Sequence, residues 1–463
     1  MKKHAIINVV GLSNKLLQQN MPFLSQWAKQ PRRVTHINPV LPAVTCSAQY
    51  TYLTGKYPSE HGIVANGWLF RDEQEIKLWR QSNKLVQAPK IWEVARAQNP
   101  DFTCANMFWW YNMYSSVDYC VTPRPQYFAD GRKMPDCYSF PMDIRPRLQE
   151  ALGTFPLFNF WGPRTNIQSS RWIAEASMLV HDWYDPTLML VYLPHLDYNL
   201  QRYGQGHPSV EKDLQEIDDV VKDLITHLEA KEVEVTVLSG YSITDVDRPI
   251  HLNRIFRENG LLSIREERGL ELLDVGTSRA VAMADHQIAH IYVPDPADLP
   301  LVRKLVEKAP GVALLLDETG KKEYHLDHER SGELVAVADD RSWFTYYYWL
   351  DDRKAPDYAR TVDIHRKPGF DPVEMFLDPQ KKLIMPRIAW KVLKKKLGFR
   401  MLMNVVPLNA NLIKGSHGRI HVADADKPVF ISRQETPTHL EAPDVFNWLL
   451  RGMGLEVAAT AAG

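Results

Sequence analysis

Residues 41–67 read LPAVTCSAQYTYLTGKYPSEHGIVANG, an apolar segment followed by a cluster of Thr, Gly, Pro and His. The apolar segment ends at Thr45, and residues 47–53 then have a composition compatible with a helix. The first turn of a helix offers unpaired backbone N–H groups and the positive end of the helix dipole. We therefore expect the Thr45 hydroxyl to lie where attack on a phosphate ester is favoured. If Thr45 is considered alone, the alternative is that its side chain only caps the helix.

The stretch resembles the nucleophile region of the nucleotide pyrophosphatase/phosphodiesterase family, in the alkaline phosphatase superfamily, whose pattern is approximately PxxTxPNxxTxxTGxYPxxHGI. The positions that agree in register are Pro42, Thr45, Thr51, Thr54, Gly55, Tyr57, Pro58, His61, Gly62 and Ile63. The resemblance implies that Thr45 is the nucleophile. The PN pair of the pattern is replaced by Ser47 and Ala48, so the Asn that normally helps to hold the transferring phosphoryl group is missing.

The periodicity of the remaining chain agrees with the fold that the resemblance implies. Residues 4–11 and 187–193 are continuous apolar runs, typical of strands buried in a parallel sheet. Residues 166–183 and 209–230 have the pattern of amphipathic helices. We expect an α/β, doubly wound, mostly parallel sheet with helices on both faces and a site at the carboxyl ends of the strands.

A chain of 463 residues suits a single alkaline-phosphatase-like domain over residues 1–463. Within it, residues 68–165 and 295–410 are expected to contain cap or insertion segments. Aromatic residues are dense over 68–79 and 108–140. Their rings would either stack on a planar substrate group, such as a nucleobase, or simply pack against the core.

The resemblance also implies a two-metal centre, and the ligands of one metal are missing. The Asp expected after the first strand is replaced by Val10. The Asp and His of the SDHGM motif are replaced by Gly240 and Tyr241. Among the groups around the nucleophile-activating metal only Thr45 remains, so we do not expect a two-metal centre.

The ligands of the other metal are partly retained. Asp197 matches the Asp of the DxxGHxxG motif, Gln201 stands at its His position, and His417 lies in a GxHG loop. A zinc site needs three or four N, O or S ligands. Asp197, Gln201 and His417 could therefore hold at most one divalent ion, zinc or manganese, with His195 or water completing the shell.

Other residues are candidates for the same site. Tyr241 and Asn66 are expected to contact the substrate, and Tyr241 or a His could also help to activate Thr45. Asp285 could orient His286 on a strand predicted over residues 281–294, which makes this pair a second candidate site. A His in a sheet is, however, more often a hydrogen-bonded structural residue.

Composition limits the classes of partner. The formal net charge of −1 gives no reason to expect a nucleic acid polymer or a membrane as partner, and a solvated helix face explains the basic run at 391–400. The short apolar run near the N-terminus is no convincing signal peptide, and no apolar stretch approaches the roughly twenty residues of a membrane span. Four cysteines without CxxC spacing are expected to be free thiols. We therefore expect a cytoplasmic protein, compatible with a homo-oligomer, that takes a small phosphorylated substrate or ligand.

Three functions remain open at this point. The first is a phosphodiesterase or nucleotide pyrophosphatase-like hydrolase with Thr45 as nucleophile and a reduced metal site. The second is a pseudoenzyme of the same fold that binds a phosphorylated or aromatic ligand without hydrolysing it. The third, covalent catalysis through Cys46, ranks last because the local sequence supplies no base that would lower the pKa of its thiol.

Overall fold

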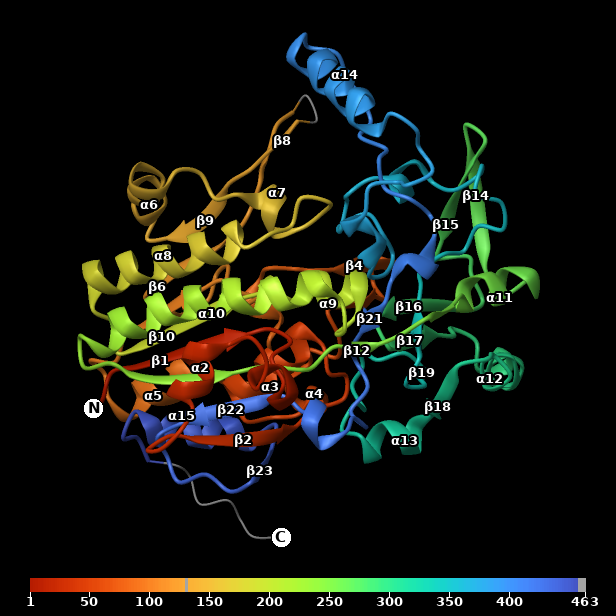
Figure 1. Cartoon of the computed structure of the whole chain (residues 1–463). Helices are drawn as coiled ribbons and strands as arrows, with labels where there is room; N and C mark the ends of the chain where they lie inside the picture. The colour runs from red at the N-terminus through yellow and green to blue at the C-terminus, as the bar shows by residue number, and fades with distance from the viewer. Residues whose placement is uncertain (130–131, 457–463) are drawn as a thin grey trace.

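The computed structural model describes residues 1–129 and 132–456, and in these a central nine-stranded sheet carries the fold (Figure 1). In spatial order its strands are β23 (His439–Glu441), β2 (Arg33–Asn38), β22 (Val429–Ser432), β11 (Glu234–Leu238), β1 (His4–Val9), β10 (Leu188–Leu193), β5 (Cys104–Met107), β6 (Tyr119–Pro123) and β9 (Cys137–Phe140). β1 pairs in parallel with β10 and β11, and β5 in parallel with β10 and β6. The antiparallel pairings involve β22 and β9, so the predicted mostly parallel sheet is confirmed.

Helices cover both faces of this sheet. One group comprises α2 (Pro22–Trp27), α8 (Gln168–Tyr184) and α10 (Pro208–Glu229), and the other α3 (Thr45–Thr54), α5 (Ile91–Gln98) and α15 (Asp444–Gly452). On α10 the buried residues Leu214, Ile217, Val221, Leu224 and Leu228 recur at three- to four-residue spacing. This spacing places them on one helix face, and their burial explains why the periodicity predicted the helix correctly.

A second sheet follows in the chain, and here one sequence prediction is wrong. Its strands are β16 (Val281–Asp285), β17 (Ile288–Tyr292), β19 (Leu334–Ala338) and β18 (Val312–Leu316). The single strand predicted over 281–294 is thus a β16–β17 hairpin, with its turn at His286 and Gln287. His286 has a φ of 61°, which a strand cannot accommodate. Because apolar residues flank the turn on both sides, periodicity gives no signal for it.

Shorter elements complete the structure. They are α1 (Asn14–Leu17), α4 (Pro58–His61), β3 (Gly67–Phe70), β4 (Glu75–Leu78), β7 (Gln126–Tyr127), β8 (Lys133–Met134), α6 (Ile144–Leu152), α7 (Leu157–Phe160), α9 (His195–Tyr203), β12 (Thr244–Asp245), β13 (Arg248–Ile250), α11 (Leu252–Glu258), β14 (Ser263–Glu267), β15 (Leu270–Asp274), α12 (Leu299–Glu307), α13 (Glu318–Glu323), β20 (Ser342–Phe344), α14 (Ile384–Lys396) and β21 (Gly415–Ser416). Of the predicted cap range 68–165, strands β5, β6 and β9 lie in the central sheet. None of the described helices has the length and apolarity needed to cross a bilayer.

Candidate active site

Thr45 is the first residue of α3. Val44 before it is extended, with φ −126° and ψ 163°, so the helix begins abruptly at the hydroxyl-bearing residue. At the other end Gly55 adopts φ 67°, a left-handed conformation that favours glycine and ends the helix. The N–H of Cys46 donates to the Asn66 side-chain oxygen at 3.0 Å. Thr45 is 5% exposed and lines a large pocket, so its hydroxyl is available to a ligand there.

The Thr45 hydroxyl is connected to a buried carboxylate through Tyr241. The Tyr241 hydroxyl lies 3.0 Å from the Thr45 Oγ1 and donates to the Asp197 Oδ1 at 3.3 Å. Tyr241 comes from the loop after β11, and Asp197 from α9, directly after β10. The segments that follow β10 and β11, the two strands on either side of β1, thus bring these groups to Thr45, as expected for an open α/β sheet. If Tyr241 donates to Asp197, the Thr45 hydroxyl is the donor to Tyr241.

Beside this chain of hydroxyls, four rings form a column of two stacked pairs, with the two His rings tilted against each other. Tyr241 stacks on His417 with ring centroids 3.7 Å apart, His417 lies 3.7 Å from His286, and His286 lies 3.7 Å from Phe370. The His417 Nδ1 is 2.8 Å from the carbonyl oxygen of Ala43. This nitrogen must be the donor, so the neutral ring carries its lone pair on Nε2, 4.0 Å from the Asp197 Oδ1.

Burial determines the protonation of these groups. It raises the pKa of Asp197 to about 7, although the polar groups of Gln201 and Tyr241 oppose the rise. Burial lowers the pKa of His417 to about 3 and that of His286 well below its usual value. It also holds the pKa of the Tyr241 phenol well above 10. Both imidazoles in the column are therefore neutral at physiological pH.

The donor groups do not fit the nucleophile-side metal of the family. Val10 and Gly240 offer no donor atom, and the Tyr241 hydroxyl is already engaged by Thr45 and Asp197. For the other metal, the His417 Nε2 and both amide atoms of Gln201 are buried without a hydrogen-bond partner in the described chain. Gln201 also lies one helical turn after Asp197 on α9, so the three residues can serve one ion at most.

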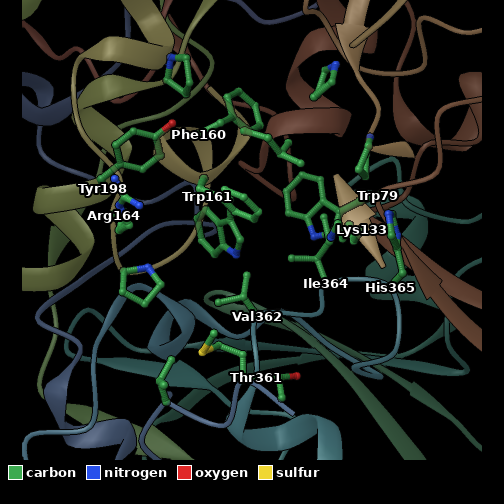
Figure 2. A pocket seen from close by; sticks show the side chains of 18 of the residues that line it. Trp79, Lys133, Phe160, Trp161, Arg164, Tyr198, Thr361, Val362, Ile364 and His365 are labelled. Carbon is green, nitrogen blue, oxygen red and sulfur yellow. The ribbon is translucent and has the colours of Figure 1, made fainter. Parts of the chain in front are cut away.

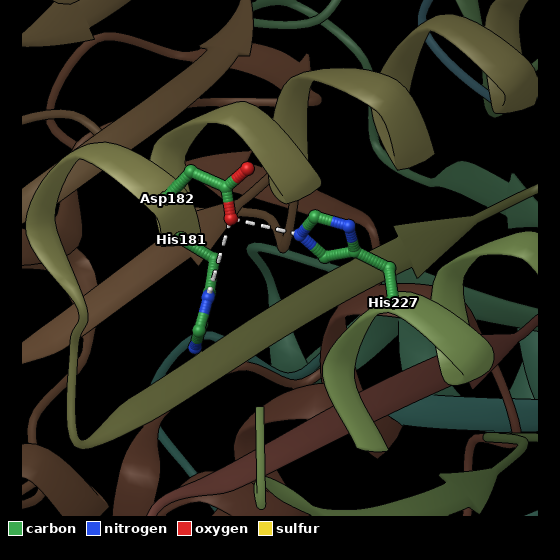
Figure 3. Close-up of side chains that lie close together, drawn as sticks. All are labelled: His181, Asp182 and His227. Carbon is green, nitrogen blue, oxygen red and sulfur yellow. Dashed lines mark hydrogen bonds and ion pairs between the residues drawn. The ribbon is translucent and has the colours of Figure 1, made fainter. Parts of the chain in front are cut away.

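Two other groups of candidate metal ligands lie away from Thr45. In the first, on α8 and α10, the Asp182 Oδ1 is 2.8 Å from the His227 Nε2 and 3.8 Å from the His181 Nδ1 (Figure 3). Lys231 also pairs with this carboxylate, which opposes a second cation. In the second, the His195 Nε2 lies 3.4 Å from Asp213 and 3.3 Å from Glu216 on α10. His195 is therefore not brought to the Thr45 site.

Asn66 holds the site together through contacts within the protein. Its backbone N–H and its side-chain amide donate to the two oxygens of Asp285, at 2.8 and 3.0 Å, while its side-chain oxygen accepts from Cys46. Burial raises the pKa of Asp285 to about 7. Asp285 is thus engaged with Asn66 and not primarily with His286, which lies 3.7 Å away and lines the pocket. Burial also raises the pKa of the Cys46 thiol well above 9, which disfavours Cys46 as a nucleophile.

The pocket above Thr45 has a volume of about 800 Å³ and a mostly apolar lining (Figure 2). Trp79, Trp110 and Tyr127 of the aromatic-rich range line it, whereas Trp109 and Tyr111 are buried in the core. The packing interpretation therefore holds for the buried rings, and stacking of the pocket rings on a planar substrate group stays a prediction. Sequence reasoning did not identify a larger group of lining residues, which includes Phe158, Phe160, Trp161, Arg164, Thr361, Val362, Ile364, His365, Met385, Ile388 and Val392. The aromatic run at 155–161 was the available signal for part of this group.

Comparison with solved structures supports the fold. Over the whole of this chain, human ectonucleotide pyrophosphatase/phosphodiesterase 5 superposes with a TM-score of 0.61 at 14% identity, covering 97% of that chain. An inactive variant of the mouse protein, in complex with AMP, gives 0.60 at 14% identity and covers all of this chain and 98% of that one. Phosphonoacetate hydrolase of Sinorhizobium meliloti, in complex with phosphonoformate, gives 0.59 at 14% identity and covers 98% of this chain and 96% of that one. These likenesses establish an alkaline-phosphatase-like fold.

Sequence comparison gives the family. An uncharacterised pyrophosphatase/phosphodiesterase of Schizosaccharomyces pombe is 26% identical over 248 residues, which make up 51% of this chain and 44% of that relative. The alignment thus spans less than half the length of that relative. The family model for type I phosphodiesterase/nucleotide pyrophosphatase matches residues 4–371, well over half of this chain. On that match the chain belongs to the type I phosphodiesterase/nucleotide pyrophosphatase family.

Proposed function

We propose that this protein hydrolyses phosphoric ester or anhydride bonds with Thr45 as the nucleophile. The observation that carries the proposal is the position of the Thr45 hydroxyl. It stands on the first turn of α3, lines the pocket, and is linked through Tyr241 to the Asp197 carboxylate. An activated nucleophile needs a neighbouring group that can take its proton, and this chain of hydroxyls leads to such a group.

The proposed reaction has two steps. In the first, Thr45 Oγ1 forms a bond to phosphorus as the bond from phosphorus to the leaving oxygen breaks. The Thr45 proton is shared along Tyr241 toward Asp197, and the leaving oxygen takes a proton from solvent. In the second, a water oxygen forms a bond to phosphorus as the bond from phosphorus to Thr45 Oγ1 breaks. The water loses a proton to solvent, and Thr45 Oγ1 takes its proton back along Tyr241. The N-terminal end of α3 stabilises the negative charge on the transferring group.

Asp197, Gln201 and His417 would hold a single divalent ion, on the donor atoms described above. When bound, such an ion would draw negative charge from the phosphoryl oxygens. The orientation of Thr45 by Tyr241 does not depend on it, since both hydrogen bonds are made by side chains of this chain. The neutral His417 ring is additionally fixed by Ala43 and by the stacked Tyr241.

The loss of donors at Val10 and Gly240 favours the alternative, a pseudoenzyme that binds a phosphorylated or aromatic ligand without hydrolysing it. Hydrolysis of an aryl phosphodiester by the purified protein distinguishes the two. We expect turnover in the wild type, loss of at least a hundredfold in Thr45→Ala, and retention of part of it in Thr45→Ser, which keeps a hydroxyl. Elemental analysis of the same preparation should give no more than one metal per chain.

A pocket residue without an assigned chemical role supplies the matched control. Thr361 lines the pocket and donates its hydroxyl to the Tyr358 carbonyl, so Thr361→Ala should leave turnover within about threefold of the wild type. Absence of Thr45-dependent turnover, with zinc or manganese added, refutes the hydrolase. If phosphate esters then still raise the melting temperature, the result favours the pseudoenzyme.

A further inference from the structure

Helix α14 (Ile384–Lys396) stands away from the body of the molecule (Figure 1), and three of its residues line the pocket. Every residue of this helix whose side-chain burial is described is partly or fully exposed. A helix with so little burial gains little stability from packing, so its apolar residues need another explanation.

The apolar residues of α14 form two separate faces. Met385, Ile388 and Val392 recur at three- to four-residue spacing and line the pocket. Trp390 and Leu393, with Leu397 directly after the helix, recur at the same kind of spacing on a second face, roughly 140° further around the helix. Their exposed fractions are 57%, 46% and 64%. A surface helix of a globular protein normally has one apolar face, so the second face suggests a partner.

The charge around this second face has a single sign. Residues 381–404 contain eight Lys and Arg and no Asp or Glu, in a chain whose net charge is −1. Lys381 contacts Asp378 at 3.4 Å. Within the described part of the chain, Lys382, Arg387 and Lys394 make no ion pair with a carboxylate. The segment therefore combines large apolar side chains with uncompensated positive charge.

Neighbouring elements extend the apolar surface at the mouth of the pocket. Tyr127 of β7 and Phe158 of α7 line the pocket and are 57% and 48% exposed. Leu383 and Phe399, which flank α14, are 74% and 65% exposed. The rim of the pocket and the second face of α14 thus present large apolar side chains together with Lys and Arg.

We propose that α14 and this rim dock on an anionic lipid membrane. An interfacial helix buries Trp and Leu at the boundary of the acyl chains while its Lys and Arg side chains contact anionic headgroups. The charge favours this partner over a second copy of the chain. In a two-fold dimer the same basic segments would face each other and repel. Docking would bring the mouth of the pocket, and with it the path to Thr45, against the membrane.

Vesicle sedimentation with the full-length protein tests this proposal. Vesicles of phosphatidylcholine alone are compared with vesicles containing about 30% phosphatidylserine, at low and high salt. We expect at least tenfold tighter binding to the anionic vesicles, and weaker binding as salt rises. The triple variant Trp390→Ser, Leu393→Ser, Leu397→Ser should reduce binding at least tenfold. The double variant Lys382→Glu, Lys394→Glu reverses two of the positive charges and should also weaken binding to the anionic vesicles.

The control is a pair of exposed apolar residues that do not line the pocket, Phe140→Ser with Met142→Ser, which should bind vesicles like the wild type. All substituted side chains are exposed, and melting curves confirm that each variant is folded. Failure of the wild type to bind either vesicle, or equal binding by the triple variant, overturns the proposal. A third outcome would also overturn it: light scattering shows a dimer in the wild type and a monomer in the triple variant, and neither binds vesicles. The second face of α14 would then contact a second copy of the chain.

Discussion

Removal of the Tyr241 hydroxyl separates its hydrogen bonds from its stacking. Tyr241→Phe keeps a ring at 3.7 Å from His417 but leaves Thr45 and Asp197 without the hydroxyl between them. A hydrogen bond to a charged group contributes about 1.5–3 kcal/mol. If that energy orients the nucleophile in the transition state, kcat for an aryl phosphodiester should fall roughly 10- to 150-fold, with KM nearly unchanged.

Steady-state kinetics of Tyr241→Phe and of Tyr241→Leu measure this directly. Tyr241→Leu removes the stacked ring as well, and His417 would then lose its support, so kcat should fall further and the melting temperature should drop. A kcat for Tyr241→Phe within twofold of the wild type would refute the reasoning, because the link from Thr45 to Asp197 would then have no part in the reaction. An equal rise in KM with unchanged kcat would also refute it, since this indicates a binding role alone.

Two further predictions concern stability. Lys367 is 1% exposed and pairs with Asp371 at 2.8 Å and with Glu374 at 2.7 Å, so Lys367→Met should lower the free energy of unfolding in urea by about 3–5 kcal/mol. The exposed Lys322→Met, which breaks a solvent-screened surface pair, should change the free energy of unfolding far less than Lys367→Met, and similar losses in both variants would contradict this account. Burial lowers the pKa of His4 from 6.5 to about 4, so the unfolded chain takes up a proton before the folded one and stability falls as pH falls from 6.5 to 4. Between pH 7.5 and 5 this amounts to about 2 kcal/mol, which should disappear from the pH dependence of unfolding in His4→Gln.

The fold was predictable because the resemblance and the periodicity pointed the same way. The run from Pro42 to Ile63 identified the family over one short stretch, and the buried apolar runs of β1 and β10 followed from their composition. The hairpin at His286 was missed because a two-residue turn with apolar strands on both sides leaves the alternation unbroken. That turn places His286 beside His417, a contact between residues 131 positions apart that no local pattern contains.

The substitutions at the metal-ligand positions predicted a lost metal site, which stays a prediction, and did not predict what the new side chains do instead. At position 241 a metal-binding His was expected and a Tyr was found, and the sequence does not say where its hydroxyl lies. The structure places it 3.0 Å from Thr45 and 3.3 Å from Asp197, and its ring on His417. One residue therefore contacts the nucleophile, the retained carboxylate and the retained imidazole. Such a role depends on the segments that follow β10, β11 and β21 meeting beside the first turn of α3, which only the tertiary structure defines.

The expectation of no membrane partner rested on the net charge of −1. Helix α14 illustrates that the net charge of a chain does not describe the charge of one part of its surface. Charges interact over about one Debye length, roughly 8 Å at physiological ionic strength, so a surface responds to local charge rather than to the total. Eight basic residues in 24 positions outweigh distant acidic groups at that range. The basic run was assigned to a solvated helix face from its charge alone. Trp390 and Leu397 are more than half exposed beside these charges, and this combination of apolar and basic side chains favours an anionic membrane.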